Sequence, residues 1–355
     1  MHKIKWMLLG LLPLLLTGCW DGRDPEDRAY VITMGIDQTA EGLSFTLLPA
    51  KTTSQTPQAY QVTAETLAGA VAQADSHSSR EVYLGQLKTV VFGQSLLADA
   101  TALDGILAEL ERGTAVSDKV MVLGSAGSAA DCVRAIGETD GATGLFLWEF
   151  YKNTAKEVAV TRGMDLDTLL TDLRIQKGNV ILPRMETREE GLTLAGGIAL
   201  ADGAYAFALS PEMEQAHLLL LEEGIGAVWE GEYQGESIPM EIRKNQVSYH
   251  AIVEEDGTAD CRISLELSGA LVGGTQKVME SSQRRALENF FADIIKTDLE
   301  NTIKEVQEIT SADVFGIGAA IQRQMGKTEF AVQDWQNWEI SVDCRINLQD
   351  TGRMR

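Results

Sequence analysis

The residues around Cys19 in the sequence predict a specific chemical modification of its thiol. Two lysines give the chain a positively charged start, an apolar stretch runs from Trp6 to Leu16, and small residues stand directly before the cysteine. This order is typical of a secretory signal peptide over residues 1–18. The ending Leu-Thr-Gly-Cys also matches the bacterial lipobox, in which the thiol receives a diacylglycerol by thioether linkage. We therefore expect cleavage before Cys19 and lipid attachment to its sulfur.

Acylation of Cys19 would anchor the mature chain to a membrane. An S-diacylglycerol cysteine with an N-palmitoyl group supplies more than one acyl chain, and stable anchoring needs two such signals. The apolar stretch is shorter than the roughly 20 residues of a transmembrane helix, and Asp21 and Arg23 follow it at once. The alternative is an ordinary thiol after a generic export signal. The pattern favours a protein that is tethered to the bilayer and does not span it.

Histidine and serine patterns give no support for a metal centre or a catalytic site. After removal of the signal the histidines are His77, His217 and His250, which lie far apart without a second ligand at metal-binding spacing. Ser125 stands in Leu-Gly-Ser-Ala-Gly, which resembles a serine nucleophile elbow, but Leu123 replaces the first glycine. We interpret this segment as a turn from a strand to a helix. We predict no catalytic residue, metal or cofactor, and a protein that is not an enzyme.

Two further patterns have a structural and a binding interpretation. Residues 313–318, Asp-Val-Phe-Gly-Ile-Gly, begin like a dinucleotide fingerprint, but they follow a helix, and Ile321 stands where a small residue belongs. We expect no phosphate binding there. An aromatic cluster at residues 146–151 could line a pocket or an interface, although a buried helix face is more common. Its members are Phe146, Trp148, Phe150 and Tyr151.

The cysteines other than Cys19 do not imply a disulfide framework. They are Cys132, Cys261 and Cys344, an odd number. Cys261 and Cys344 both lie on the apolar parity of alternating segments, so a bridge between neighbouring strands is conceivable in an export compartment. The other interpretation, which we favour, is that both are buried thiols that behave as small apolar side chains.

Composition limits the class of protein and its partners. The chain has 355 residues, 45% of them hydrophobic, which is enough for two or three folded domains. Its formal net charge of −22 repels phosphate backbones and anionic headgroups, so nucleic-acid binding is excluded. Because no polybasic patch is present, membrane attachment must come from the lipid and from protein partners.

The first half of the mature chain predicts alternating strands and helices. We expect a hairpin, a loop and then strands and helices in turn. The predicted segments are a hairpin at 31–37 and 43–47, a loop at 52–61, helices at 67–74, 96–112 and 129–136, and strands at 86–92 and 119–123.

The second half has a different pattern. Strand-like segments at 192–195, 197–200 and 205–209 precede a helix that begins with Ser210-Pro211. Next come a hairpin with strict alternation, a long amphipathic helix and a last alternating strand. These fall at 247–253 with 261–267, at 276–309 and at 338–348. The fold class is therefore α+β and multi-domain, with a mixed α/β region at 19–188 that could divide in two, and a domain at 189–355 in which an antiparallel sheet packs against the long helix.

An ordered set of short motifs resembles one family, the Ger(x)C lipoproteins, which are the C subunits of germinant receptors in endospore-forming bacteria. The motifs cover nearly the whole mature chain in order. They are Cys19-Trp20-Asp21, Met34-Gly-Ile-Asp37, Gln86-Leu-Lys-Thr-Val-Val-Phe-Gly93, Leu182-Pro183, Gly197-Ile-Ala-Leu200, Leu209-Ser-Pro-Glu212, Asp313-Val-Phe-Gly-Ile-Gly318, Asp334-Trp335 and the terminal strand to Gly352.

The resemblance implies a lipid-anchored subunit on the outer face of the inner spore membrane. Its expected partners are an integral-membrane A subunit and a transporter-like B subunit, and its expected role is non-catalytic, in receptor assembly or in signalling from small germinants. Cys19 is the one site residue that the resemblance transfers. The rival hypothesis is a lipoprotein solute-binding protein of a transporter, which should show two similar doubly wound lobes joined by hinge strands.

Overall fold

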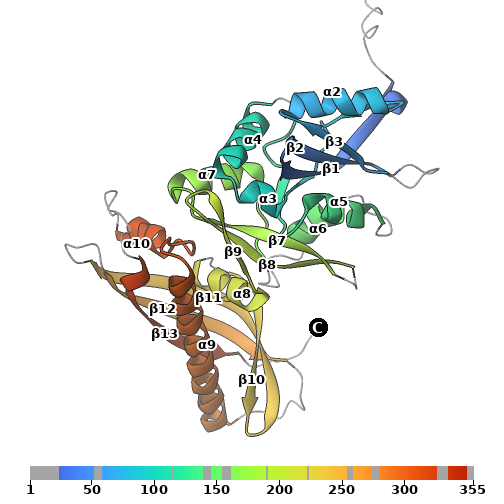
Figure 1. The fold of residues 1–355 in the computed structure, drawn as a ribbon. Helices are drawn as coiled ribbons and strands as arrows, with labels where there is room; N and C mark the ends of the chain where they lie inside the picture. Colours follow the sequence, from blue (N-terminus) through green and yellow to red (C-terminus); the bar gives the residue numbers. More distant parts are fainter. Residues whose placement is uncertain are drawn as a thin grey trace, which may run out of the picture.

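The computed structural model contains two β-sheets with helices packed on them (Figure 1). It describes residues 24–51, 58–113, 115–138, 145–153, 161–188, 191–221, 224–253, 259–272, 280–325 and 335–349. A nine-stranded sheet occupies the first part of the chain and a four-stranded sheet the second. This agrees with the predicted α+β, multi-domain fold class.

The nine-stranded sheet has the order β3-β2-β1-β5-β6-β7-β8-β9, with β4 paired to the start of β1. Its centre is parallel, since β1, β5, β6 and β7 run in one direction, and both sides continue as antiparallel hairpins. A short 3-10 turn, η2 (Pro25–Asp27), leads into it. The strands are β1 (Arg28–Thr39), β2 (Gly42–Pro49), β3 (Tyr60–Ala64), β4 (Glu81–Tyr83), β5 (Thr89–Phe92), β6 (Met121–Gly124), β7 (Val180–Arg188), β8 (Gly191–Ala201) and β9 (Ala204–Leu209).

Helices cover both faces of this sheet. Val90 and Val122 point into a core with α2, α4 and α7, whereas Val91 and Leu123, one position on, point into a core with α5 and α6. Strands buried on both faces are continuous apolar runs, as Thr-Val-Val-Phe in β5 illustrates. The helices are α2 (Leu67–His77), α3 (Gln94–Leu97), α4 (Ala100–Arg112), α5 (Ala129–Glu138), α6 (Leu145–Asn153) and α7 (Leu166–Ile175).

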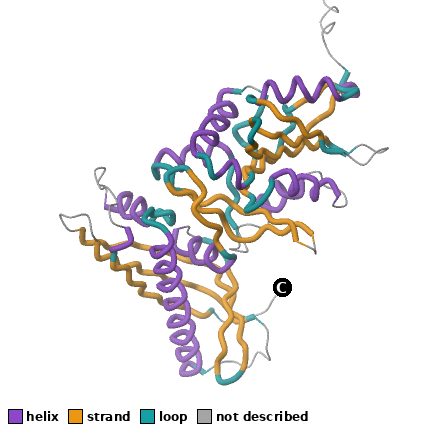
Figure 2. Tube along the Cα trace, in the orientation of Figure 1, coloured by secondary structure: helices purple, strands orange, loops and turns teal. Residues whose placement is uncertain are grey.

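The four-stranded sheet is covered by the long helix α9 on one face (Figure 2). Along β12 every second residue from Ala259 to Leu267 is buried and the residues between them are exposed or half-buried, so the opposite face contacts solvent. The elements are β10 (Ala227–Tyr233), β11 (Glu236–Val253), β12 (Ala259–Leu271), α9 (Ser281–Ile309), α10 (Ile317–Met325), the 3-10 turn η3 (Trp335–Asn337) and β13 (Glu339–Leu348).

One edge of this sheet differs from the antiparallel expectation. β10, β11 and β12 are antiparallel as predicted, but β13 pairs with β12 in parallel. The reason is that α9 carries the chain back along the sheet before β13 begins, which is the crossover that a parallel pair requires. The predicted helix at 276–309 begins at Ser281, and residues 276–279 lie outside the described part.

The helix α8 (Pro211–Leu221) joins the two sheets. It contacts β8 and β9 of the large sheet, and also β11 and α9 of the small one. Side chains of the large sheet, including Ile181, Ala199 and Leu209, belong to the same apolar core as α9. The proposed domain boundary between residues 188 and 189 falls between the end of β7 and the start of β8, which pair within one sheet.

Several element predictions differ in detail from the structure. The helix predicted at 96–112 is two helices, because Asp99 accepts the amide N–H of Thr101 and Ala102 and caps α4. The strand β7 was not predicted. The segments 192–195 and 197–200 form one strand, β8, with Gly196 at φ 71°. The predicted loop at 52–61 lies partly outside the described residues and ends in β3.

Candidate functional site

Cys19 and the predicted signal peptide lie outside the described residues, which begin at residue 24. Four residues later Arg28 starts β1, next to the first residue of β4. A lipid on Cys19 would therefore lie a short linker away from the amino end of β1. Acylation of the thiol stays a prediction.

Asp37, the last residue of the Met-Gly-Ile-Asp motif, holds helix α5 against strand β1. Its carboxylate accepts the amide N–H of Ala129 at 2.8 Å and of Ala130 at 2.9 Å, and it lies 3.3 Å from the hydroxyl of Ser128. The first amides of a helix have no partner within the helix, so a buried carboxylate there both satisfies them and interacts with the helix dipole. The role of Asp37 is to cap a helix 92 residues away in sequence.

Glycines make room for this carboxylate and for helix α5. A Cβ on Gly93 would lie 1.8 Å from Asp37 Oδ1, and one on Gly35 would lie 2.9 Å from Val133 of α5. Two separate motifs of the sequence, at 34–37 and 86–93, therefore meet at one point. Their glycine and aspartate form a single structural unit with the start of α5.

Asp313 performs the same task in the second part of the molecule. Its carboxylate accepts the amide N–H of Ile317 at 3.1 Å and of Gly318 at 2.7 Å, at the start of α10. These are the amides that a dinucleotide fingerprint would offer to a phosphate. In this chain the Asp313 carboxylate already accepts both of these amides.

A buried polar cluster surrounds Asp313 at the junction of the two sheets. Burial raises the pKa of Asp313 to about 6, while the amide hydrogen bonds and the nearby His217 act to lower it. His217 Nδ1 lies 3.3 Å from Glu214 Oε2, both side chains are buried, and the His217 ring packs 5.0 Å from that of Phe315. Tyr249 also faces this region, and burial raises its pKa. His217 and Asp313 are considered separately in the sequence; the fold brings them together with Glu214 of α8 and with Phe315 from the segment before α10.

The other residues considered as candidate catalytic or metal-binding groups are Ser125, His77 and His250. Ser125 lies in the predicted turn between β6 and α5, where its hydroxyl accepts the amide N–H of Gly127 at 3.2 Å. His77 ends α2 and His250 lies on β11, and both side chains are exposed. Within the described residues, no group of three or more histidine, cysteine, aspartate or glutamate side chains is placed to hold a metal ion.

The thiols of Cys261 and Cys344 are not bonded to each other. Register places Cys344 opposite Leu265 and Cys261 opposite Ile340, so the two cysteines lie four residue pairs apart on β12 and β13. Cys132, Cys261 and Cys344 are all free. Burial raises the pKa of Cys261 and of Cys344 to about 12. The bridge is wrong, and the favoured interpretation of two buried thiols is confirmed for Cys261, whereas Cys344 is half-buried.

The aromatic cluster forms one helix, α6, with two environments. Tyr151 is buried, its hydroxyl lies 3.4 Å from that of Thr161, and burial raises its pKa. Trp148 is 36% exposed and Phe150 is half-buried. Phe146 is one of the residues whose side chain is not described. The cluster is thus in part a buried helix face, as expected, and in part surface.

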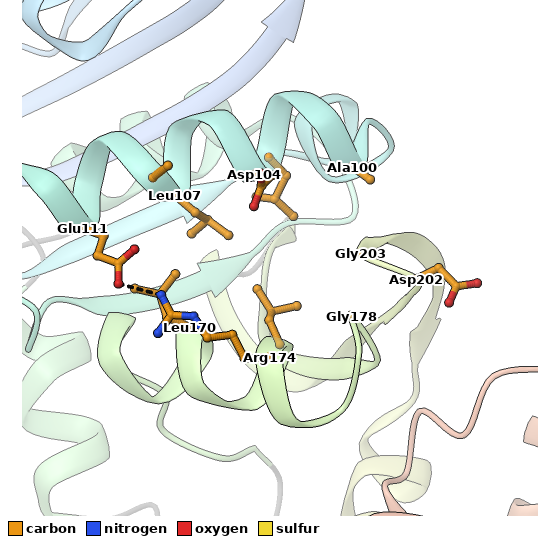
Figure 3. Close-up of a pocket in the computed structure, with 12 residues that line it drawn as sticks. Ala100, Asp104, Leu107, Glu111, Leu170, Arg174, Gly178, Asp202 and Gly203 are labelled. Atoms are coloured by element: carbon orange, nitrogen blue, oxygen red, sulfur yellow. Dashed lines mark hydrogen bonds and ion pairs between the residues drawn. The ribbon is translucent and has the colours of Figure 1, made fainter. Parts of the chain in front are cut away.

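A groove of about 380 Å³ lies between α4 and α7 (Figure 3). Its floor is apolar, with Leu103 and Leu107 from α4, and Leu170 and Leu173 from α7. The α4 pair is buried beneath the groove, while the α7 pair is only half-buried. Nothing in the sequence pattern located this groove, because it depends on the spacing between two helices.

Charged side chains surround the groove. At one end Arg174 Nη2 lies 2.6 Å from Glu111 Oε1 and links the two helices. Asp104 stands on α4 above the floor, and Asp202 lies at the other end beside Gly178 and Gly203, with its carboxylate directed outward (Figure 3). Within the described part of the chain, neither Asp104 nor Asp202 forms an ion pair through its carboxylate.

These features define a class of protein: two sheets joined through one helix, in which two buried aspartates, Asp37 and Asp313, each cap a helix. Among the described residues, no helix is both long and apolar enough to cross a membrane.

Comparisons with known proteins identify the family. The family model described as "Spore germination protein N-terminal domain" matches residues 21–187, and "Spore germination B3/GerAC like, C-terminal" matches residues 196–352. The chain belongs to this GerAC-like family of spore germination proteins.

A curated protein and a solved structure are similar over most of the chain. "Spore germination protein B3" of Bacillus subtilis (strain 168) is 23% identical over 338 residues, covering 87% of this chain and 86% of the relative. The crystal structure of the GerBC protein matches with a TM-score of 0.60 and 16% identity, covering 89% of this chain and 96% of GerBC. At that identity the structural match establishes the fold.

Proposed function

We propose that this protein is the lipid-anchored, non-catalytic C subunit of a spore germinant receptor. The observation that carries the proposal is the order of the two family models, which follow one another along the chain directly after the predicted lipobox cysteine, Cys19. The protein would be tethered to the outer face of the inner spore membrane by acyl chains. Its ectodomain would contact integral-membrane A and B subunits, and it would contribute to receptor assembly or to signalling from small-molecule germinants.

The arrangement of the sheets favours this function over the transporter rival. A solute-binding protein would have two similar doubly wound lobes around a ligand cleft. Here the first sheet has nine strands with helices on both faces, and the second has four strands with one long helix. The two parts are not repeats of one another, and α8 packs between them.

The polar groups of the described residues support a non-catalytic role. Asp37 and Asp313 use their carboxylate oxygens on helix amides, and Ser125 bonds its own turn. An enzyme would need titratable groups that converge on an open cleft. What this protein offers instead is an acidic surface with an apolar groove, which fits contact with other proteins.

Affinity purification from spore membranes tests the proposed function. The tagged full-length chain, solubilised in mild detergent, should recover the integral-membrane A and B subunits, and a strain lacking the gene should germinate poorly in response to nutrients. Recovery of no integral-membrane partner, together with normal germination of the deletion strain, would contradict the proposal. Recovery of a permease and an ATPase would favour the transporter rival.

A further inference from the structure

We propose that the groove between α4 and α7 is the docking site for a basic amphipathic segment of an integral-membrane receptor subunit. This inference rests on the proposed function and adds the surface and the chemistry of the contact. An apolar side chain of the partner would insert between Leu107 and Leu170, and lysine or arginine side chains beside it would face Asp104 and Asp202.

The shape of the groove favours a protein segment over a small molecule. Pockets for small ligands enclose most of the ligand surface, commonly 70–90% or more. This groove lies between two surface helices, and the leucines that α7 contributes to its floor remain half-buried. A helix or extended segment laid along it would cover these leucines, which is the helix-in-groove mode of recognition.

The charges around the groove specify a basic partner. The residues that line it include three carboxylates and one guanidinium, and that guanidinium, of Arg174, is already paired with Glu111. Asp104 and Asp202 are exposed and have no ion-pair partner in the described part of the chain. Because the whole chain carries a formal charge of −22, its field attracts a cationic segment from a distance.

The groove is preformed, which lowers the entropy that binding must remove. Arg174 and Glu111 fix the spacing of the helices at one end. At the other end the amide N–H of Gly203 donates to the Gly178 carbonyl at 2.9 Å, and a Cβ on Gly178 would lie 2.6 Å from Gly203 N. Two turns that pack backbone against backbone thus form a rigid wall.

The test uses the tagged full-length chain in spore membranes, with recovery of the A and B subunits measured by quantitative mass spectrometry. Ala108→Trp fills the groove from a half-buried position on α4, and Gly105→Trp places the same bulk on the open side of that helix. The double variant Asp104→Lys and Asp202→Asn reverses and removes the rim charge, while Glu138→Lys changes an exposed charge on α5. Asn is chosen at 202 because the backbone there has φ 50°.

Ala108→Trp should reduce recovery of the partner subunit about tenfold, and the double charge variant by a smaller factor that shrinks in high salt. Gly105→Trp and Glu138→Lys should recover it as well as the unmodified chain. Far-UV circular dichroism and the thermal midpoint of each variant show whether it is folded. If folded Ala108→Trp recovers the subunits normally, the groove is not the docking site, although the proposed function stands.

Two other outcomes overturn the inference. If the unmodified chain recovers no integral-membrane subunit, the proposed function fails and the groove assignment fails with it. If native mass spectrometry finds a low-molecular-mass compound on the unmodified chain but not on Ala108→Trp, and the subunits are recovered by both, the groove is a small-ligand site.

Discussion

The two sheets of this protein bury their apolar side chains in different ways. The nine-stranded sheet has helices on both faces, so its central strands are apolar throughout, whereas the four-stranded sheet leaves one face to solvent and relies on α9 for the other. Each part also contains a helix capped by a buried aspartate from outside that helix, Asp37 for α5 and Asp313 for α10. The comparison teaches that the first part distributes its apolar side chains over two cores, whereas the second has one core, to which α9 contributes the longest apolar face.

Removing a large side chain from α9 should have the largest effect on stability. Phe291 is fully buried in the core beneath the four-stranded sheet, so Phe291→Ala should lower the free energy of unfolding by about 3–5 kcal/mol. Urea unfolding of the chain expressed without residues 1–19 measures this. Glu305→Ala, at an exposed position of α9, should stay within about 0.5 kcal/mol. A loss below about 1.5 kcal/mol for Phe291→Ala would show that α9 is not the main support of this sheet.

Removing the cap of α5 should have the next largest effect. Asp37→Ala leaves the amides of Ala129 and Ala130 buried without their acceptor, so the free energy of unfolding should fall by about 2–3 kcal/mol. Hydrogen exchange should locate the loss at the start of α5. The matched control is Asp131→Ala, an exposed aspartate on the same helix, for which we expect a small change. Equal effects of the two substitutions would contradict the assigned role of Asp37.

The Asp313 cap of α10 should make the stability of the folded chain depend on pH. Because burial raises the pKa of Asp313 to about 6 from 3.8, the folded chain holds this proton more tightly than the unfolded chain. Its contribution to stability is therefore present at low pH and is lost as the pH rises from about 4 through 6. Asp313→Asn does not titrate, so the stability of the native chain relative to this variant should decline across that interval. Parallel profiles of the two proteins would refute the assignment.

The same comparison explains which features the sequence predicted. Strands β11 and β12 and helix α9 were predicted because one face of each is solvent-exposed and the polar residues mark the period. The strand β7 was missed, since Pro183 and Arg184 interrupt its apolar run and resemble a loop. The division of the predicted helix at Asp99 does have a local signal in the sequence. Aspartate is a common N-cap residue, and Asp99 directly precedes α4.

Roles that depend on distant residues were beyond sequence reasoning. Asp37 and Gly93 both belong to short motifs of the sequence, but only the fold brings Gly93 and the start of α5 to the carboxylate. The parallel pairing of β13 depends on the direction in which α9 returns, and the alternation of β13 is the same in either direction. The groove depends on the separation of α4 and α7, which no residue pattern contains.

The lipid on Cys19 is tested most directly by substituting that residue in the full-length chain. Intact mass and radiolabelled palmitate would show whether the mature protein carries acyl chains, and fractionation of spores would show where it resides. We predict that Cys19→Ser abolishes the lipid, releases the protein from the membrane fraction and impairs nutrient germination, whereas Cys344→Ser leaves all three unchanged. A Cys19→Ser protein that lacks lipid yet stays in the membrane and supports normal germination would contradict the account.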